Sequence, residues 1–441
     1  MCSREASANE PLPGGAGVAI PSPILSLVEG RSLDAFPSIS VVVPVRNRPA
    51  EIKRCLDSLT TLDYPAERLE IIIVDDASTD ETPVVVREYP ARNVSLVAAT
   101  QHRGQSACRN DGAERGAGDV IAFIDSDCTA DAKWLLALVP DLEEPYVVAA
   151  GGSVRESNSR GWLKRYEASL SPLNMGEAPA RVLQGSQVEF LPSCNVLIRR
   201  TAFREVGGFD PDLRFGEDVD LIWRLMSVGE VRYRPDGIVW HDHRGRLGAF
   251  VKNRIRYASA QAVFLSRHGN RRRLDLPVGL LAGFILAVIL SFVSVWFLAA
   301  ALVGSVVEAI QGLLFGGVER ARRVVAGYAS TGYRAMTLVG RQYAIPLAAI
   351  SAVLYPFWRW APLGMLIASV CILSPAVIEW LRRRPRLDPG RFLLAFVIDT
   401  LSVGIGTVAG SIKHRTLAPL AISIHVHVCA VNVPPSKAFI R

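Results

Sequence analysis

The sequence predicts an α/β protein, with a doubly wound, mostly parallel sheet followed by helices that associate with a membrane. Two observations lead to this fold class. Between Ser38 and Asp125, short β-branched runs alternate with helical patterns about every 25 residues, which implies crossover connections between parallel strands. Further along, the 32 residues from Leu276 to Val307 carry no charge. That stretch exceeds the ~20 apolar residues that cross a bilayer.

The elements of the predicted sheet follow from local patterns. After the first strand, apolar residues recur at helical spacing, and a helix-start signal at Ser78-Thr79-Asp80 follows the second strand. A glycine precedes a further predicted helix, Gln105–Arg115, which follows the third strand. The predicted strands are Ser38–Val45, Leu69–Val74, Val94–Ala98 and Val120–Ile124, and the apolar face of the first helix is Ile52, Cys55, Leu56 and Leu59.

Composition divides the 441 residues into unlike parts. A Pro-, Gly- and Ser-rich lead-in (1–37) precedes an α/β domain (38–265), a membrane-associated helical region (266–415) and a tail of unknown structure (416–441). Within the helical region, 276–307 is a candidate span, 308–342 fits an amphipathic interfacial helix and 363–378 is a shorter apolar stretch. A third apolar stretch, 392–412, is a weaker candidate because Asp399 and three glycines interrupt it.

Charge and cysteine usage exclude several classes of protein. The chain is 50% hydrophobic and 21% charged, which excludes a disordered chain or a collagen. The net charge of +7 comes largely from arginine clusters beside the apolar stretches, which is typical of cytoplasmic membrane anchors rather than of a nucleic-acid surface. The seven cysteines are scattered and odd in number, which favours reduced thiols in a cytosolic setting. The N-terminus has no basic start followed by an apolar core, so no secretory signal is expected.

Polar residues gather where three predicted strands end. They are Arg46-Asn47, Asp75-Asp76 and Asp125-Ser126-Asp127. Ligands of doubly wound sheets bind beyond the carboxyl ends of the strands. Each acid by itself fits a helix cap or a turn, but three such sites at one edge favour a functional interpretation.

Each of these acids suggests a particular chemistry. The carboxylates of Asp125 and Asp127, on one turn, can both face a divalent cation that grips a diphosphate. Asp76 could accept a hydrogen bond from a base, while helix capping is the alternative for Asp75 or Asp76. Arg109, in the first turns of its helix, could face a nucleotide, or could simply be a surface residue.

Two later segments add candidate residues. Glu217 and Asp218 precede an apolar helical face, and a carboxylate beside an acceptor hydroxyl is what a general base requires. Capping is the alternative for Glu217 or Asp220. His241, in Trp240-His241-Asp242-His243, is a candidate metal ligand, although a lone histidine is more often structural.

The segments VVVPVRNR, IIIVDDAST, GQSACRND, FIDSD, GGFD, GEDVDLIWR and WHDH occur in this order. Together they resemble the inverting family 2 glycosyltransferases over about residues 38–244. RYEASLSPLNMG (165–176) and the hydrophobic tail further resemble the mycofactocin-system glycosyltransferases, which are thought to glycosylate a peptide-derived redox cofactor. The resemblance implies a GT-A catalytic domain, which is a Rossmann-like, doubly wound mixed sheet.

The resemblance also implies roles for individual residues. Asp76 reads the nucleotide base with help from Pro44 and Arg109, while Asp125 and Asp127 serve as ribose and metal ligands. Asp218 acts as the general base, and His241 lies on the metal or the diphosphate. Together with the strand-end residues, the candidate set is catalytic Asp218 and Glu217; nucleotide-sugar-binding Pro44, Arg46, Asn47, Asp75, Asp76, Arg109 and Asp125; and metal-binding Asp125, Asp127 and His241.

The expected activity is therefore transfer of a sugar from a UDP- or GDP-sugar to an acceptor hydroxyl, with Mg²⁺ or Mn²⁺, on the cytoplasmic side of the cell membrane. Two alternatives remain: a glycosyltransferase acting on a lipid-linked or cell-envelope acceptor, and a non-catalytic membrane protein that binds nucleotide sugars. The QxxRW signature of processive synthases is missing, so extrusion of a long chain is disfavoured.

Overall fold

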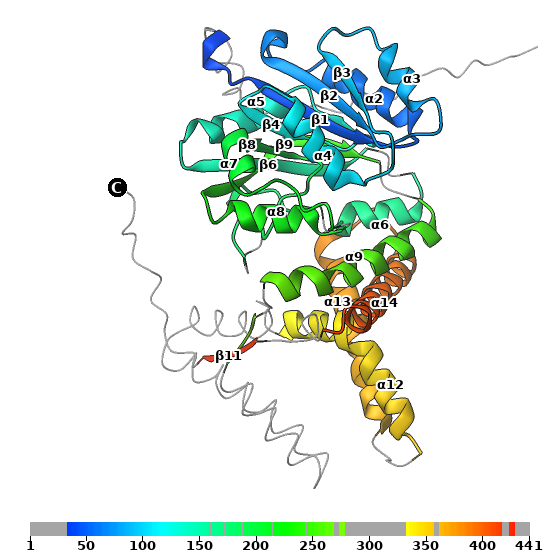
Figure 1. Ribbon diagram of the computed structural model, residues 1–441. Coiled ribbons are helices and arrows are strands. Elements are labelled where there is room, and N and C mark those ends of the chain that lie inside the picture. The colour runs from blue at the N-terminus through cyan, green and yellow to red at the C-terminus, as the bar shows by residue number, and fades with distance from the viewer. Residues whose placement is uncertain are drawn as a thin grey trace, which may run out of the picture. The chain divides into compact units, whose positions relative to one another are not determined.

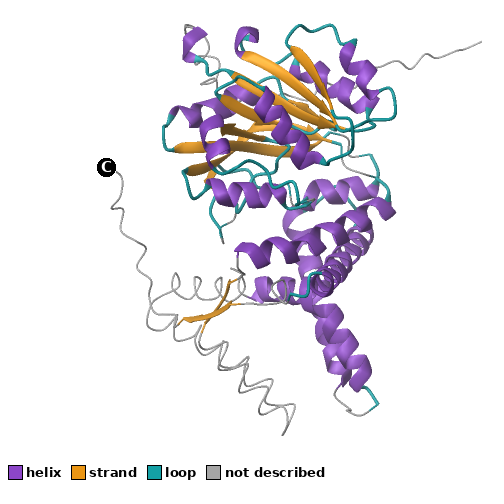
Figure 2. Ribbon diagram, viewed as in Figure 1, coloured by secondary structure: helices purple, strands orange, loops and turns teal. Residues whose placement is uncertain are grey.

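A nine-stranded mixed sheet forms the centre of the first part of the chain (Figures 1 and 2). Its strand order is β3-β2-β1-β4-β8-β6-β9-β5, and β7 pairs with β9. The computed structural model describes residues 33–157, 160–171, 173, 175–184, 186, 188–213, 215–242, 245–268, 273–277, 332–356, 361–416 and 423–427. A short 3-10 turn, Leu33–Ala35, precedes the first strand.

The first half of the sheet is parallel, as the alternation of strands and helices predicts. β1 pairs in parallel with β2 and β4, and β2 pairs in parallel with β3. Every residue of β1 is buried, and the four apolar residues predicted to face the sheet from the first helix are buried as well. The elements are β1 (Ile39–Val45), α2 (Pro49–Leu59), a 3-10 turn (Ala66–Arg68), β2 (Leu69–Asp75), α3 (Thr82–Arg87), β3 (Val94–Ala98), α4 (Gln105–Arg115) and β4 (Val120–Phe123).

The helix after β2 begins later than its start signal suggests. α3 starts at Thr82, whose N–H donates to the Asp80 carboxylate at 3.0 Å. The predicted start residues Ser78 and Thr79 instead bond to the loops that precede them. The helix begins later than predicted because Ser78 and Thr79 form hydrogen bonds with residues at the edge of the sheet instead of starting the helix.

Antiparallel pairs make the second half of the sheet mixed. β8 lies antiparallel to both β4 and β6, and β9 is parallel to β6 but antiparallel to β5 and β7. This confirms the mixed sheet that the family resemblance implies. The elements are β5 (Cys128–Ala130), α5 (Trp134–Leu138), a 3-10 turn (Val139–Glu143), β6 (Val147–Glu156), α6 (Trp162–Leu170), β7 (Ala180–Arg181), β8 (Val196–Arg199), α7 (Arg200–Glu205), α8 (Glu217–Leu225) and β9 (Glu230–His241).

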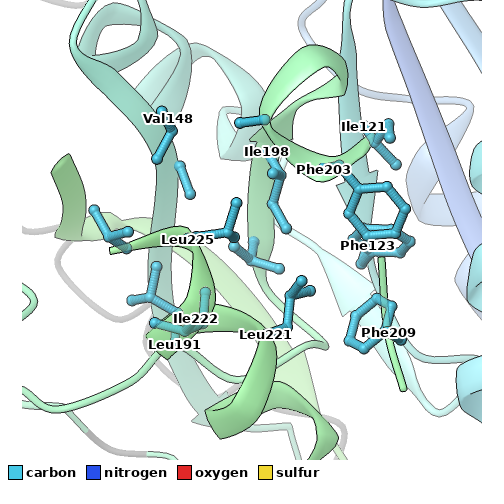
Figure 3. Packing of buried hydrophobic residues seen from close by; sticks show 14 of the residues in the cluster. Ile121, Phe123, Val148, Leu191, Ile198, Phe203, Phe209, Leu221, Ile222 and Leu225 are labelled. Carbon is cyan, nitrogen blue, oxygen red and sulfur yellow. The ribbon is translucent and has the colours of Figure 1, made fainter. Parts of the chain in front are cut away.

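An apolar cluster joins α7 and α8 to the sheet (Figure 3). Phe123 of β4 meets the ring of Phe209 edge-on, with ring centroids 5.1 Å apart. Leu221 and Ile222 of α8 are buried in the same cluster. Burying side chains of this size contributes roughly 1.5–3 kcal/mol each, so the start of α8 is firmly placed against the sheet.

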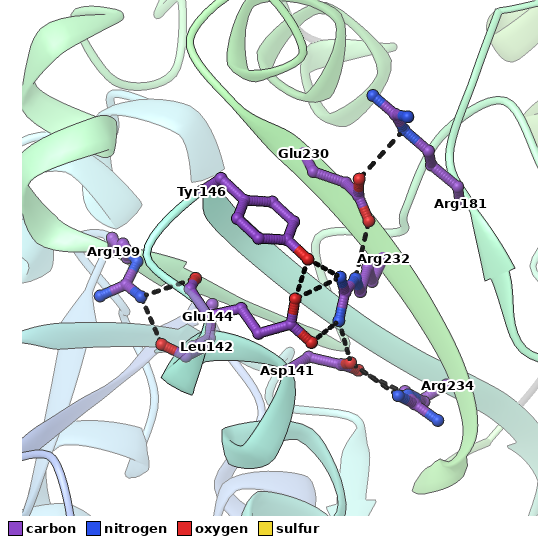
Figure 4. A network of polar contacts seen from close by, with 9 residues as sticks. All are labelled: Asp141, Leu142, Glu144, Tyr146, Arg181, Arg199, Glu230, Arg232 and Arg234. Atoms are coloured by element: carbon purple, nitrogen blue, oxygen red, sulfur yellow. Dashed lines mark hydrogen bonds and ion pairs between the residues drawn. The ribbon is translucent and has the colours of Figure 1, made fainter. Parts of the chain in front are cut away.

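An ion-pair network fixes the N-terminal end of β9, the end far from His241 (Figure 4). Arg232 pairs with Asp141 at 3.1 Å, Glu144 at 2.9 Å and Glu230 at 2.7 Å. Arg234 shares the buried Asp141 carboxylate at 2.7 Å. These residues lie near the start of β9 and hold it to the turn before β6, which is a structural task.

Helices follow the sheet domain: α9 (Leu247–His268), α12 (Ala344–Leu354), α13 (Ala361–Arg383) and α14 (Pro389–Lys413). A π-helical turn, Val339–Tyr343, precedes α12, and β10 (Arg273–Pro277) pairs in parallel with β11 (Ser423–His427). Residues 365–383 and 389–413 are long and apolar enough to cross a membrane, and the bent pair 332–341 and 344–354 would be a third candidate. Apart from residues 276 and 277 at the end of β10, the predicted span at 276–307 lies outside the described residues, as does most of the predicted interfacial helix at 308–342.

The apolar stretch at 392–412, which we rated weaker because of Asp399 and its glycines, is one continuous helix, α14. Asp399 is buried, but it accepts a hydrogen bond from the Tyr166 hydroxyl at 2.9 Å and lies 2.9 Å from Arg254 of α9. The glycines allow close packing: a Cβ on Gly406 would lie 2.4 Å from the Ile255 carbonyl oxygen. Asp399 and Gly406, which seem to interrupt the apolar stretch, are therefore the residues through which α14 contacts α6 and α9.

We predict that Gly406→Ala lowers the melting temperature of the detergent-solubilised protein. A Cβ there would also lie 2.7 Å from the Ala258 Cβ, so α9 and α14 must separate, which costs roughly 1–3 kcal/mol. Gly248→Ala, in the first turn of α9, is the matched control because nothing lies within 4 Å of its added Cβ. There the same change should leave stability unchanged or raise it. Equal melting temperatures for the two variants would contradict the close α9–α14 contact.

Candidate active site

The polar ends of three strands meet at one edge of the sheet, as expected. Val45 of β1 is paired with Asp75 of β2, and the Asp76 N–H donates to the Val45 carbonyl at 2.9 Å. β4 runs parallel to β1 on its other side and leads into Asp125 and Asp127. The structure therefore brings together segments that lie up to 80 residues apart in the sequence.

Asp127 and His241 form a candidate metal centre. Pairing of Cys128 with His241 between β5 and β9 places the His241 Nε2 atom 3.6 Å from the Asp127 carboxylate. Ligand atoms of Asp127, Cys128 and His241 all lie within 4.8 Å of one another. Burial raises the pKa of the Cys128 thiol well above its usual value and leaves carboxylate and imidazole as donors. Mg²⁺ and Mn²⁺ need few protein ligands when phosphate oxygens complete their coordination, so these residues fit such an ion.

A guanidinium also contacts the Asp127 carboxylate. Arg48 Nη1 forms a short ion pair with it, from the loop that follows β1. Burial opposes ionisation of Asp127, but His241 and Arg48 outweigh it and hold the pKa of this carboxyl below its usual value. Asp127 is therefore ionised and ready to accept a cation at neutral pH.

Arg109 lies at the centre of the site rather than on the surface. Its side chain is 1% exposed and bridges Asp125, at 2.6 Å, and Glu217, at 3.0 Å. Its guanidinium also lies over the Phe209 ring, 5.3 Å from the centroid. One buried cation thus joins the end of β4 to the start of α8, and the surface interpretation of Arg109 is wrong.

Glu217 and Asp218 open α8 after Gly216, which has a left-handed backbone (φ 76°). Glu217 is buried, and burial together with the charge of Asp218 raises its pKa to about 7 despite Arg109. Burial also raises the pKa of Asp218, although its carboxylate accepts the Val219 N–H at 2.9 Å. Glu217 makes no side-chain capping bond at the helix start, and Asp220 pairs with Arg224 at 2.6 Å. A half-buried carboxylate with a raised pKa, as in Asp218, suits proton abstraction.

Asp76 and Asp75 differ in their surroundings. Asp76 accepts hydrogen bonds from His102 Nδ1 at 2.6 Å, Arg103 N–H at 2.7 Å and Gly104 N–H at 3.0 Å. Burial opposes ionisation, but these donors hold the pKa of Asp76 below its usual value. Asp75 instead accepts bonds from the backbone and hydroxyl of Ser78 and closes the turn after β2. Asp75 therefore stabilises a turn, and neither acid caps the helix that begins at Thr82.

The remaining predicted residues lie in and after β1. Pro44 is buried within the strand. Asn47 has φ 52° and links two loops, because its N–H donates to Ser78 Oγ at 2.9 Å and its Oδ1 accepts the Thr79 N–H at 2.8 Å. Arg46 is half-buried beside them. Asn47 thus connects the loop after β1 to the loop after β2 at the carboxyl edge of the sheet.

Several residues of the site were missed by the sequence analysis. Arg48 lies in the quoted VRNR segment but contacts Asp127, whereas we singled out Arg46 and Asn47. Gln105 donates to Glu217, and Lys164 of α6 pairs with Asp242 at 2.5 Å. The motifs contained Arg48, Gln105 and Asp242, but the partners are far apart in the sequence. Periodicity carries no information about such long-range pairs.

Comparison with known proteins identifies relatives of this chain. The model of glycosyl transferase family 2 matches residues 40–207. The pre-mycofactocin glycosyltransferase of Mycobacterium tuberculosis is 30% identical over 403 residues, which are 87% of this chain and 81% of that protein. Glycosyltransferase AglE of Haloferax volcanii is 28% identical over 257 residues, 57% of this chain and 82% of that protein. Among solved structures, a mannosyltransferase from Pyrobaculum calidifontis in complex with GDP-Man and Mn²⁺ covers 78% of this chain and 88% of its own, with 20% identity and a TM-score of 0.43.

We predict that Glu217→Gln reduces the loss of stability between pH 5 and pH 8. The wild-type carboxyl keeps its proton up to about pH 7 when folded but loses it near pH 4.5 when unfolded, so the folded state binds more protons in between. Stability must then fall as the pH rises through this window. The change in unfolding free energy between pH 5 and pH 8 should shrink by more than ~1 kcal/mol in the variant.

Thermal melting at several pH values measures this difference. Glu167, whose pKa burial raises to about 7, contributes the same sign in both proteins, so only the difference between them reports on Glu217. An identical pH slope in wild type and variant would contradict a raised pKa at Glu217.

Proposed function

Because this chain belongs to glycosyltransferase family 2 and is a glycosyltransferase, we propose that it transfers a sugar from a nucleotide-diphosphate sugar to an acceptor hydroxyl with inversion at the anomeric carbon. One observation carries the proposal. Arg109 pairs through one nitrogen with Asp125, two residues before Asp127, and through another with Glu217, which immediately precedes Asp218. A donor diphosphate and an acceptor hydroxyl thereby have separate carboxylates within one site.

The donor side is built from the parallel edge. Asp76 faces the base, Asp125 the ribose, and Pro44, Arg46 and Asn47 shape the surrounding loops, with Asp75 fixing the turn after β2. Asp127 and His241 would hold Mg²⁺ or Mn²⁺, with Asp125 nearby. When bound, the ion neutralises the diphosphate and stabilises it as a leaving group. The P. calidifontis enzyme named above binds GDP-Man with Mn²⁺, while UDP- and GDP-sugars both fit this proposal.

The acceptor side centres on Asp218. Its carboxylate takes the proton of the acceptor hydroxyl, and the oxygen attacks the anomeric carbon. The bond from that carbon to the diphosphate oxygen breaks, and the nucleoside diphosphate leaves with the electron pair. Glu217 is held by Arg109 and Gln105 and therefore orients the start of α8 rather than receiving the proton.

The proposed acceptor is a peptide-derived redox cofactor of the mycofactocin type. The M. tuberculosis relative is named for pre-mycofactocin. The 165–176 segment that carries the resemblance also has a structural task, since Tyr166 bonds to Asp399 of α14 and Glu167 lies 3.7 Å from Arg254 of α9. A lipid-linked or cell-envelope acceptor is the second candidate, and the apolar helices α13 and α14 favour it.

We propose that the protein is bound to the cell membrane with its catalytic domain on the cytoplasmic side. The last turn of α13 and the turn that leads to α14 expose four arginines. Arg383 donates to the Ser169 carbonyl at 2.6 Å, and Arg165 donates to the Arg386 carbonyl at 3.5 Å, so this turn contacts α6 of the catalytic domain. Arginine-rich turns remain on the cytoplasmic side. The four arginines are Arg382, Arg383, Arg384 and Arg386.

We predict that Asp127→Ala and Asp218→Asn each reduce sugar transfer at least ~100-fold while the protein remains folded. The first removes the ligand of the cation and the second removes the base. Release of UDP or GDP from a panel of donors, with Mn²⁺ or Mg²⁺, measures the activity. Chelation with EDTA should abolish wild-type turnover, and either ion should restore it.

Asp236→Asn is the matched control, because this exposed carboxylate lies in the middle of β9, five residues before His241. It should keep wild-type activity. Full activity of Asp127→Ala or Asp218→Asn would rule out the proposed role of that residue.

The membrane orientation is tested by protease access in a bacterial expression host. We expect the catalytic domain to be protected in intact spheroplasts and digested in inverted membrane vesicles, because the Arg-rich turn and α6 lie on the same side. Antibody detection of a tag placed before residue 33 reports the cleavage. Digestion in intact spheroplasts would place the domain on the outer face and contradict the proposal.

A further inference from the structure

The end of α13, the turn after it and the start of α14 present a group of arginines, which we call the arginine surface. Five of them lie between residues 382 and 391. A sixth comes from α6, since the Arg165 guanidinium donates to the Arg386 carbonyl at 3.5 Å. All six side chains are exposed, and they belong to Arg165, Arg382, Arg383, Arg384, Arg386 and Arg391.

Little negative charge balances the arginine surface. The acids between residues 379 and 391 are Glu379 and Asp388. The Glu379 carboxylate is 5% exposed and already pairs with Arg383, and Asp388 caps α14. The side chains of Arg384 and Arg386 form no hydrogen bond or ion pair with any residue that the structure describes. The surface therefore has an excess of positive charge, and two of its guanidinium groups are open to an anion.

Exposed apolar side chains adjoin the arginine surface on both helices. Val377 and Leu381 of α13 are 50% and 56% exposed, and Leu394 of α14 is 53% exposed. They lie within two turns of the arginines, in the two segments that are long and apolar enough to cross a membrane. Arginines that immediately follow such a segment lie at the depth of the lipid headgroups, while the apolar side chains beside them face the acyl chains.

The turn that carries the two open guanidinium groups is firmly held. Leu387 is buried in one apolar cluster with Tyr166 of α6. The Trp380 indole N–H donates to the Leu387 carbonyl at 3.2 Å, and Arg383 donates to the Ser169 carbonyl of α6 at 2.6 Å. Because the backbone is fixed from both sides, binding of an anion here requires little ordering of the chain.

We propose that the arginine surface binds the phosphate groups of anionic phospholipids, such as phosphatidylglycerol, in the leaflet that faces the catalytic domain. This inference rests on the proposed membrane attachment. Guanidinium groups bind phosphate oxygens through paired N–H donors. The adjoining apolar side chains select a lipid over free phosphate, because they provide a surface for acyl chains. Since Arg165 belongs to α6, a bound headgroup also links the sheet domain to the membrane surface.

The experiment measures binding of fluorescently labelled phosphatidylglycerol to the full-length protein in an uncharged detergent, by fluorescence anisotropy. Wild type should bind phosphatidylglycerol at least about tenfold more tightly than phosphatidylcholine, and added salt should weaken the binding. The double variant Arg384→Gln/Arg386→Gln should bind it about tenfold more weakly. The pair Arg384→Lys/Arg386→Lys keeps the charge and should stay within about threefold of wild type. All variants should keep the wild-type melting temperature, because the two side chains have no partner among the described residues.

The matched control is Arg87→Gln/Arg115→Gln, which removes the same charge from exposed arginines at the ends of α3 and α4. It should bind phosphatidylglycerol as wild type does. Equal affinity of wild type for the two lipids, or equal loss of affinity in the control, would overturn the inference. So would complete displacement of the lipid by inorganic phosphate at constant ionic strength, which would identify a site for free phosphate. Recovery of wild type in the soluble fraction without detergent would refute the membrane attachment itself, and the inference with it.

Discussion

The buried guanidinium of Arg109 is the interaction on which the site depends. A fully buried arginine is tolerated only when its charge is balanced, and here Asp125 and Glu217 balance it from two different elements. Removing one partner of such a pair costs roughly 3–5 kcal/mol. The distance between the end of β4 and the start of α8 is therefore fixed by charge as well as by the apolar cluster around Phe209.

The same requirement for balanced buried charge extends into the helices that follow the sheet domain. Asp399 lies within a long apolar helix, where an unpaired carboxylate would be very unfavourable. Arg254 of α9 and the Tyr166 hydroxyl of α6 satisfy it. These contacts, with the close approach at Gly406, join α14, which is long and apolar enough to cross a membrane, to α9. Helix α9 therefore joins the sheet domain to a helix that is long and apolar enough to cross a membrane.

The sequence predicted those parts of the fold that depend on local pattern. The four parallel strands and α4 were predicted within a residue, and the buried face of α2 was predicted correctly, because burial imposes a period that single segments display. The candidate residues Asp76, Asp125, Asp127, Glu217, Asp218 and His241 were identified from motifs and from their places at strand and helix ends. Contacts between distant segments were not predictable in this way. The burial of Arg109 between two acids was not expected, Arg48 was passed over for its neighbours, and Asp399 and the glycines of α14 looked like interruptions. In each case the partner lies on another element, and only the folded chain shows that the charge or the missing side chain is compensated.

The carboxylates of the site differ in the direction of their pKa shifts, and this difference separates their tasks. His241 and Arg48 hold the pKa of Asp127 below its usual value, which keeps a negative charge available for a cation. Burial raises the pKa values of Glu217 and Asp218, with a further contribution from Asp218 at Glu217 and from Asp125 at Asp218, which makes proton uptake easier on that side. Acids whose surroundings push their pKa values apart are typical of sites that divide charge stabilisation from proton transfer. Arg109 lies between the two groups. Its positive charge, paired with Asp125 and Glu217, lowers the repulsion between them, so that acids with opposite pKa shifts can lie close together.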